Sequence, residues 1–212
     1  MNIKMNLFVM TLAAAFAGPI GFLGTDALAA GPQGGRGVRV QPLSADEAAT
    51  LTFMREEEKM ARDVYLNMAA RWAQLPFANI AKSEQQHMDA IKAKLDRYGL
   101  PDPALAEIGA FRNAELQALY DGLMDRGETA YLEALWVGGL IEEVDIEDLD
   151  NAIAATSHPD LAQVYGNLLR GSRNHLRAFA SAIERQGVVY QAQHLDQETV
   201  DAIIDSPMER GK

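Results

Sequence analysis

Four long segments of this sequence carry apolar residues at every third or fourth position, a spacing that places them on one face of an α-helix. The segments span about residues 44–72, 77–98, 128–155 and 159–186. Ser44 and Glu47 match a capping box at the start of the first segment, and Gly99 follows the second. Only Val188–Tyr190 resembles a β-strand. The sequence therefore predicts an all-α fold.

The connections between these segments predict how the helices are joined. Residues 99–112 hold two Pro and two Gly, so we expect a long connection between the second and third long helices. Shorter helices are expected at about residues 113–125 and 196–205. Four long helices with one long connection are typical of a bundle with a crossover. We predict a four-helix bundle over residues 44–186 and a C-terminal extension over residues 187–212.

The N-terminal segment has the order of a secretory signal peptide. Lys4 precedes an apolar run from Leu7 to Leu23, and Ala27-Leu28-Ala29 matches a cleavage signal. A membrane anchor is the alternative, which the Gly18-Pro19 break disfavours. We predict a signal peptide over residues 1–29 and a flexible linker over residues 30–43. The mature chain would then be periplasmic or extracellular, without a membrane segment.

Charge and cysteine content exclude several classes of function. The chain has no cysteine, which rules out disulfide scaffolds, zinc ribbons, iron–sulfur clusters and thiol catalysis. Its formal net charge is −11. Such a chain repels phosphates and anionic lipid, so we expect neither nucleic acid nor a membrane surface as a partner.

The four apolar stripes share an interruption near their middle. The first stripe, for example, runs through Leu51, Met54 and Tyr65 and is polar only between them. Ionisable residues stand at the corresponding point of every stripe. In chain order they are Glu58, Glu84, His87, Glu142, Asp145 and His175.

Acids and histidines that converge in one core need a partner. Burying an unpaired carboxylate costs several kcal/mol. A divalent cation removes this cost, since carboxylates and imidazoles are ligands for iron, manganese and zinc. Glu84 and His87 also have Glu-x-x-His spacing, which directs both side chains toward one ion. The six interrupting residues are therefore candidate ligands of divalent metal.

The residues alone leave alternatives open. Glu57 competes with Glu58, because the first segment has another apolar face through Phe53 and Val64. Glu143 competes with Glu142 for the same reason. The run from Glu56 to Lys59 could be a solvated charge run, and His175 could be an ordinary core histidine.

Two stretches resemble a known family. Glu58-Lys-Met-Ala-Arg-Asp-Val-Tyr65 and Ser83-Glu-Gln-Gln-His87-Met resemble ligand helices of rubrerythrin-type ferritin-like proteins. With Leu-Ile-Glu-Glu-Val-Asp-Ile and Arg-Gly-Ser-Arg-Asn-His-Leu, the pattern resembles an uncharacterised family of bacterial and archaeal ferritin-like proteins of unknown function. The resemblance covers about residues 44–186.

The resemblance implies a site for two divalent metal ions, with iron favoured over manganese or zinc. It also implies a role for each matching residue. Glu58 matches the ligand of the first helix, while Glu84 and His87 match the bridging Glu and the terminal His of the second. Glu142 and His175 match ligands of the third and fourth helices. The position three before His175 departs from the pattern, because it is Ser172 where the family has Glu. We expect Asp145 to replace that carboxylate, or the second metal position to be weak.

Three functions follow from these expectations. The first is a di-metal oxidoreductase that oxidises Fe²⁺ or reduces O₂ or peroxide. The second is a metal-binding or scavenging protein without turnover, and the third is a metal-free structural or partner-binding bundle. A homodimer is one assembly open to such a bundle. The sequence assigns no catalytic residue and no organic cofactor.

Overall fold

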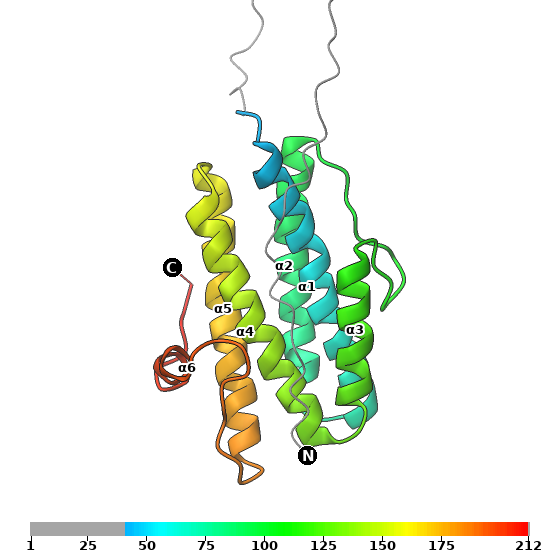
Figure 1. Ribbon diagram of the computed structural model, residues 1–212, viewed down its shortest axis with the longest axis vertical. Coiled ribbons are helices and arrows are strands. Elements are labelled where there is room, and N and C mark those ends of the chain that lie inside the picture. The colour runs from blue at the N-terminus through cyan, green and yellow to red at the C-terminus, as the bar shows by residue number, and fades with distance from the viewer. Residues whose placement is uncertain (1–40, 212) are drawn as a thin grey trace, which may run out of the picture. The chain divides into compact units, whose positions relative to one another are not determined.

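The computed structural model describes residues 41–211, which contain six α-helices and no strand (Figure 1). The prediction of an all-α fold is confirmed, and Val188–Tyr190 forms no strand. The predicted signal peptide and most of the linker lie outside the described residues. No helix in the described part is long and apolar enough to cross a membrane. The helices are α1 (Ala45–Trp72), α2 (Phe77–Tyr98), α3 (Ala114–Gly127), α4 (Tyr131–Ala155), α5 (Pro159–Glu184) and α6 (Gln197–Ile204).

The helices begin and end close to where the sequence predicts. Ser44 and Glu47 form the expected capping box before α1. Gly99 ends α2 with a φ of 69°, a left-handed conformation that glycine adopts without strain. The third long helix starts later than predicted, at Tyr131, because the preceding residues 128–130 form a turn between α3 and α4.

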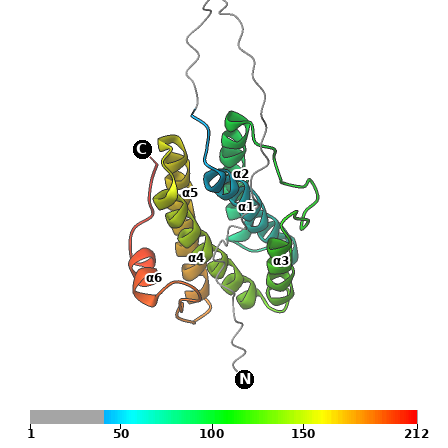
Figure 2. The same cartoon turned by 45° about the horizontal axis from the view of Figure 1, so that its top comes forward.

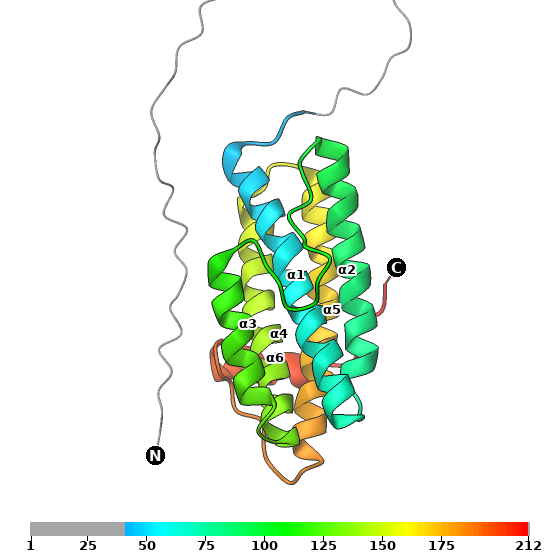
Figure 3. The ribbon, with the colours of Figure 1, turned by 90° about the vertical axis from the view of Figure 1, so that its right-hand side faces the viewer.

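The long helices form a bundle. α1 packs along α2, α4 packs along α5, and α3 lies against both α1 and α4 (Figure 3). The connection from Gly99 to Asn113 crosses the outer face of α1 before α3 begins. The middle of α1, from Met54 to Ala61, is therefore enclosed on all sides.

This enclosure overturns one reading of the sequence. The run Glu56–Lys59 is not solvated, because every residue from Met54 to Ala61 is buried. Glu56 accepts hydrogen bonds from the backbone N–H groups of Arg112 and Asn113 in the connection. Lys59 forms a buried ion pair with Asp63 and donates to the Glu107 carbonyl. The charges on this side of α1 are thus satisfied by polar groups of the connection and of α1 itself.

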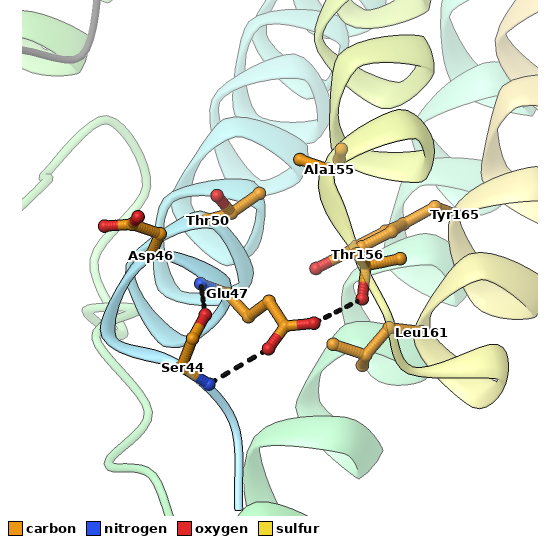
Figure 4. Close-up of a pocket in the computed structure, with 9 residues that line it drawn as sticks. Ser44, Asp46, Glu47, Thr50, Ala155, Thr156, Leu161 and Tyr165 are labelled. Carbon is orange, nitrogen blue, oxygen red and sulfur yellow. Dashed lines mark hydrogen bonds between the residues drawn. The ribbon is translucent and has the colours of Figure 1, made fainter.

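Glu47 also joins α1 to the turn between α4 and α5. Its carboxylate accepts hydrogen bonds from the Thr156 hydroxyl and the Ser157 N–H, both at 2.9 Å, and lies 2.8 Å from His158 Nδ1. A cavity of about 150 Å³ lies beside it, lined by Thr50 and Tyr165 among others (Figure 4). None of the candidate metal ligands lines this cavity.

The C-terminal segment folds back onto α4 and α5 (Figure 2). The Glu143 carboxylate accepts hydrogen bonds from the Tyr190 hydroxyl and from the N–H groups of Gln193, His194 and Leu195. Farther along, Arg173 and Arg177 of α5 pair with Glu209. The residues after α5 are therefore packed against the helices that carry the candidate ligands.

Candidate metal centre

The structure brings five of the six sequence-predicted ligands together. α1 supplies Glu58, α2 supplies Glu84 and His87, α4 supplies Glu142, and α5 supplies His175. These side chains form two groups whose potential ligand atoms all lie within 4.8 Å of one another. The first group is Glu58, Glu84 and His87, and the second is Glu84, Glu142 and His175. All five residues are buried.

Glu84 belongs to both groups because its two carboxylate oxygens face different histidines. Oε2 lies 2.8 Å from His87 Nδ1, and Oε1 lies 2.7 Å from His175 Nδ1. Each imidazole nitrogen also faces a second carboxylate, with Glu58 at 3.2 Å from His87 and Glu142 at 3.4 Å from His175. The centre is thus two similar half-sites joined by one carboxylate.

Several buried polar atoms of the centre have no hydrogen-bond partner, as is expected of metal ligands in the absence of a cation. Glu84 Oε1 and His175 Nδ1 are close, yet each is buried without a properly directed hydrogen bond, and so is Glu58 Oε1. Buried polar atoms rarely lack partners in native proteins. Ligands that bind zinc tetrahedrally at about 2.0–2.2 Å lie about 3.3–3.6 Å from each other. The spacings of 2.7–3.4 Å found here would have to widen only slightly to admit an ion. The buried acid and histidine groups could therefore hold metal ions.

Several neighbouring residues hold these side chains in place. The Tyr65 hydroxyl donates to Glu142 Oε1 at 2.5 Å. His175 Nε2 lies 2.9 Å from the Ser83 hydroxyl, so that a proton on Nε2 would leave Nδ1 free as a ligand. The two imidazole rings stack with their centroids 5.5 Å apart. A Cβ on Gly171 would lie 2.5 Å from His87 Nε2, so His87 occupies the space that a side chain at this position would need.

Ser83 and Gly171 were not singled out from the sequence. Ser83 belongs to no apolar stripe, and its role depends on a contact between α2 and α5. Gly171 carries a usable signal, because a glycine inside a long helix often marks a close approach. Tyr65 was recognised as part of a stripe and of a resemblance, but not as a partner of Glu142.

Asp145 lies beside the centre without belonging to either group. Its Oδ2 accepts a short hydrogen bond from Ser172, the residue that stands where the resembled family has Glu. Its Oδ1 is buried and has no hydrogen-bond partner. The serine therefore holds the very carboxylate that we expect to replace the missing one, while its binding to metal stays a prediction.

The alternatives Glu57 and Glu143 face away from the two groups. Glu143 holds the C-terminal segment, as described above. Glu57 lies near Asp148 of α4, and burial together with the charge of Asp148 raises the pKa of Glu57 well above its usual range. The geometry therefore favours Glu58 and Glu142 over their neighbours.

Burial and mutual charge shift the pKa values of the centre. Burial raises the pKa of Glu58 to about 7 and also raises that of Glu142. Burial raises the pKa of Glu84 too, but the two histidines outweigh it and lower this pKa overall. Burial lowers the pKa of His175, but Glu84 and Glu142 outweigh it and raise this pKa to about 10. The metal-free centre therefore retains protons that a bound cation would displace.

These shifts predict that the metal-free protein loses stability as the pH rises. The folded-state pKa of Glu58 exceeds its ordinary 4.5, and that of His175 exceeds its ordinary 6.5, so the folded state binds more protons than the unfolded state. We expect the melting temperature in chelator to fall between about pH 5 and pH 9. Saturating Mn²⁺ should reduce this fall. A melting temperature that rises over this range in chelator would contradict the assigned environment.

Comparison with known proteins shows that a single family matches nearly the whole helical region. The family described as "Uncharacterized protein domain (DUF2202)" matches residues 47–207. The uncharacterized protein MJ0754 of Methanocaldococcus jannaschii is 45% identical over 172 residues, which cover 81% of this chain and 93% of that protein. Neither description states an activity.

Solved structures also resemble the chain. The crystal structure of the hypothetical protein MJ0754 from Methanococcus jannaschii has a TM-score of 0.79 and 44% identity, and the match covers 82% of this chain and 99% of that one. A DUF305 fragment from Deinococcus radiodurans has a TM-score of 0.53 and 18% identity, over 68% of this chain and 99% of that one. The second likeness concerns the fold alone.

Proposed function

Since the chain belongs to the DUF2202 family, whose description assigns no activity, we propose a function from the site: binding of two divalent metal ions, with iron favoured, inside a ferritin-like four-helix bundle. The observation that carries this proposal is the position of Glu84, whose oxygens each lie within 2.8 Å of a different imidazole nitrogen. A carboxylate in that position can bridge two cations. Each half-site adds one further carboxylate, Glu58 or Glu142.

The residues around the centre have defined tasks in this proposal. His87 and His175 would bind through Nδ1, and Ser83 would keep the Nε2 proton of His175 in place. Tyr65 orients Glu142 by donating to the oxygen that does not face His175. Iron held there would supply redox chemistry in which electrons from Fe²⁺ reduce O₂ or peroxide.

A metal-scavenging protein without turnover is the second candidate function. Ser172 favours the scavenging function, because its hydroxyl donates a hydrogen bond to Asp145 and it has no carboxylate that could bridge two ions. The net charge of −11 would attract cations in either case. A chain exported by its first 29 residues would meet those cations outside the cytoplasm.

Metal analysis of the exported protein tests the proposal. We expect a mature chain that begins at Ala30, by mass spectrometry, and two ions per chain, by elemental analysis of protein made with ample iron and manganese. Rates of Fe²⁺ oxidation and peroxide consumption then separate the oxidoreductase from the scavenger. If the protein stays metal-free after incubation with Fe²⁺ or Mn²⁺, both metal-binding functions are refuted, and only the metal-free structural or partner-binding bundle remains.

A further inference from the structure

The two half-sites of the centre use the same kinds of ligand. Each has one histidine and one carboxylate of its own and shares Glu84 with the other. We call them the His87 half-site, which includes Glu58, and the His175 half-site, which includes Glu142. The distances from each imidazole nitrogen to its carboxylates are also alike, between 2.7 and 3.4 Å. Any difference in how firmly they bind an ion is therefore expected to come from the residues around the ligands.

The His175 half-site is held from outside by two hydroxyl groups. The Ser83 hydroxyl lies 2.9 Å from His175 Nε2, and the Tyr65 hydroxyl donates to Glu142 Oε1 at 2.5 Å. Ser83 belongs to α2 and Tyr65 to α1, so each contact joins a ligand to another helix. Both ligands of this half-site thus have a hydrogen bond that fixes their orientation. Outer partners of this kind typically change metal affinity by about 10–100-fold.

The His87 half-site has no such outer partners among residues 41–211. His87 makes its polar contacts there through Nδ1, and they go to other ligands of the centre, Glu58 and Glu84. Glu58 Oε1 is buried and has no hydrogen-bond partner in the same part of the chain. The His87 ring packs instead against Gly171, where a Cβ would lie 2.5 Å from Nε2. A packing contact limits the position of the ring, but it does not select the tautomer as a hydrogen bond does.

The histidines lie on the more accessible side of the centre. The exposed fraction is 10% for the His87 side chain and 9% for the His175 side chain, against at most 3% for the three glutamates. Exchange of an ion with solvent is therefore expected on the side of α2 and α5, which carry these histidines. An ion can leave only if a ligand moves away from it. On this side Ser83 holds His175, whereas no outer hydrogen bond from the described residues holds His87.

We infer that the two metal positions are inequivalent: the His175 half-site retains its ion, and the His87 half-site exchanges its ion with solvent. Ser83 and Tyr65 are the positioning residues that set this difference, and Gly171 leaves the space that His87 occupies. The inference deepens the proposed function and rests on it. It predicts two Mn²⁺ affinities that differ by about tenfold or more, the effect of at least one outer partner.

Titration with Mn²⁺, followed through the electron paramagnetic resonance signal of the free ion, measures both affinities. We expect Ser83→Ala and Tyr65→Phe each to lower the higher affinity by about 10–100-fold and to leave the lower one unchanged. Ser83→Thr keeps the hydroxyl and should bind both ions as the wild type does. Tyr165→Phe is the matched control for Tyr65→Phe, because Tyr165 is also buried but its hydroxyl has no hydrogen-bond partner among the described residues.

The His87 half-site is tested through Gly171. Gly171→Ala should displace the His87 ring and reduce only the lower affinity, by at least about tenfold. Gly166→Ala is its matched control on the same helix, because a Cβ at Gly166 would meet no atom within 4 Å. This control should bind both ions as the wild type does. Circular dichroism and thermal unfolding would show that each variant is folded.

The titrations also keep the inference apart from the proposed function. If the wild type binds two ions with equal affinities, the half-sites are equivalent, and the inference is overturned while the metal centre stands. The same holds if Ser83→Ala and Gly171→Ala reduce the same affinity. If the wild type binds no Mn²⁺ or only one ion, the proposed centre for two ions fails, and the inference fails with it.

Discussion

Replacing Glu84 by glutamine is expected to abolish the binding of both ions under conditions that saturate the wild type. The carboxylate offers one oxygen to each half-site, whereas the amide has one oxygen and a nitrogen without a free lone pair. We expect the affinity of each ion to fall at least about 100-fold, the upper end of what loss of an outer-shell partner costs. Isothermal titration with Mn²⁺ would measure both affinities.

A histidine variant provides the contrast. His87→Ala removes a ligand from the Glu58 half-site only, so we expect a loss of at least about tenfold in one affinity. Its partner half-site retains Glu84, Glu142 and His175. If Glu84→Gln and His87→Ala lowered the affinities of both ions to the same extent, Glu84 would not be shared between the half-sites in the way the geometry indicates.

Replacing Glu143 by alanine is expected to lower the free energy of unfolding by about 2–4 kcal/mol. The carboxylate is fully buried, and its removal leaves the Tyr190 hydroxyl and three successive N–H groups without their acceptor. Urea unfolding would measure the loss. Hydrogen exchange should also become faster at the amides of Gln193, His194 and Leu195.

Glu147→Ala is the matched control for this prediction. Glu147 stands one turn along α4, is exposed, and forms a surface ion pair with His194. Surface pairs contribute little, so we expect a change within about 0.5 kcal/mol. If Glu143→Ala lowers the free energy of unfolding no more than Glu147→Ala does, the Glu143 carboxylate is not what mainly holds the C-terminal segment.

The helices could be predicted because their signals are local. Ser44, Glu47 and Gly99 each act within one helical turn, and the all-α fold is confirmed. The convergence of acids and histidines was also visible, because each apolar stripe breaks at the same depth. The sequence could not choose between Glu57 and Glu58, since α1 is enclosed and both of its faces are apolar.

Contacts between distant segments were the part that the sequence could not reveal. Glu143 is buried because residues 190–195 return to it, and no periodic pattern in α4 records those donors. Glu56 likewise depends on backbone N–H groups of the connection before α3. A solvated charge run was for this reason an open alternative for Glu56–Lys59, although Glu56 is buried by backbone partners 56 and 57 residues away.

The three successive glutamates of α1 create an ambiguity of helical register. Each is turned by about 100° from the last, so Glu56, Glu57 and Glu58 face the connection, Asp148 and His87 respectively. If α1 slipped by one residue, an acid would still occupy two of these three places. The glutamates therefore cannot fix the alignment of the helix. Buried polar contacts are well suited to setting the register of a helix. In α1 the residues that flank the glutamates make such contacts: Arg55 pairs with Asp102, and Lys59 donates to the Glu107 carbonyl.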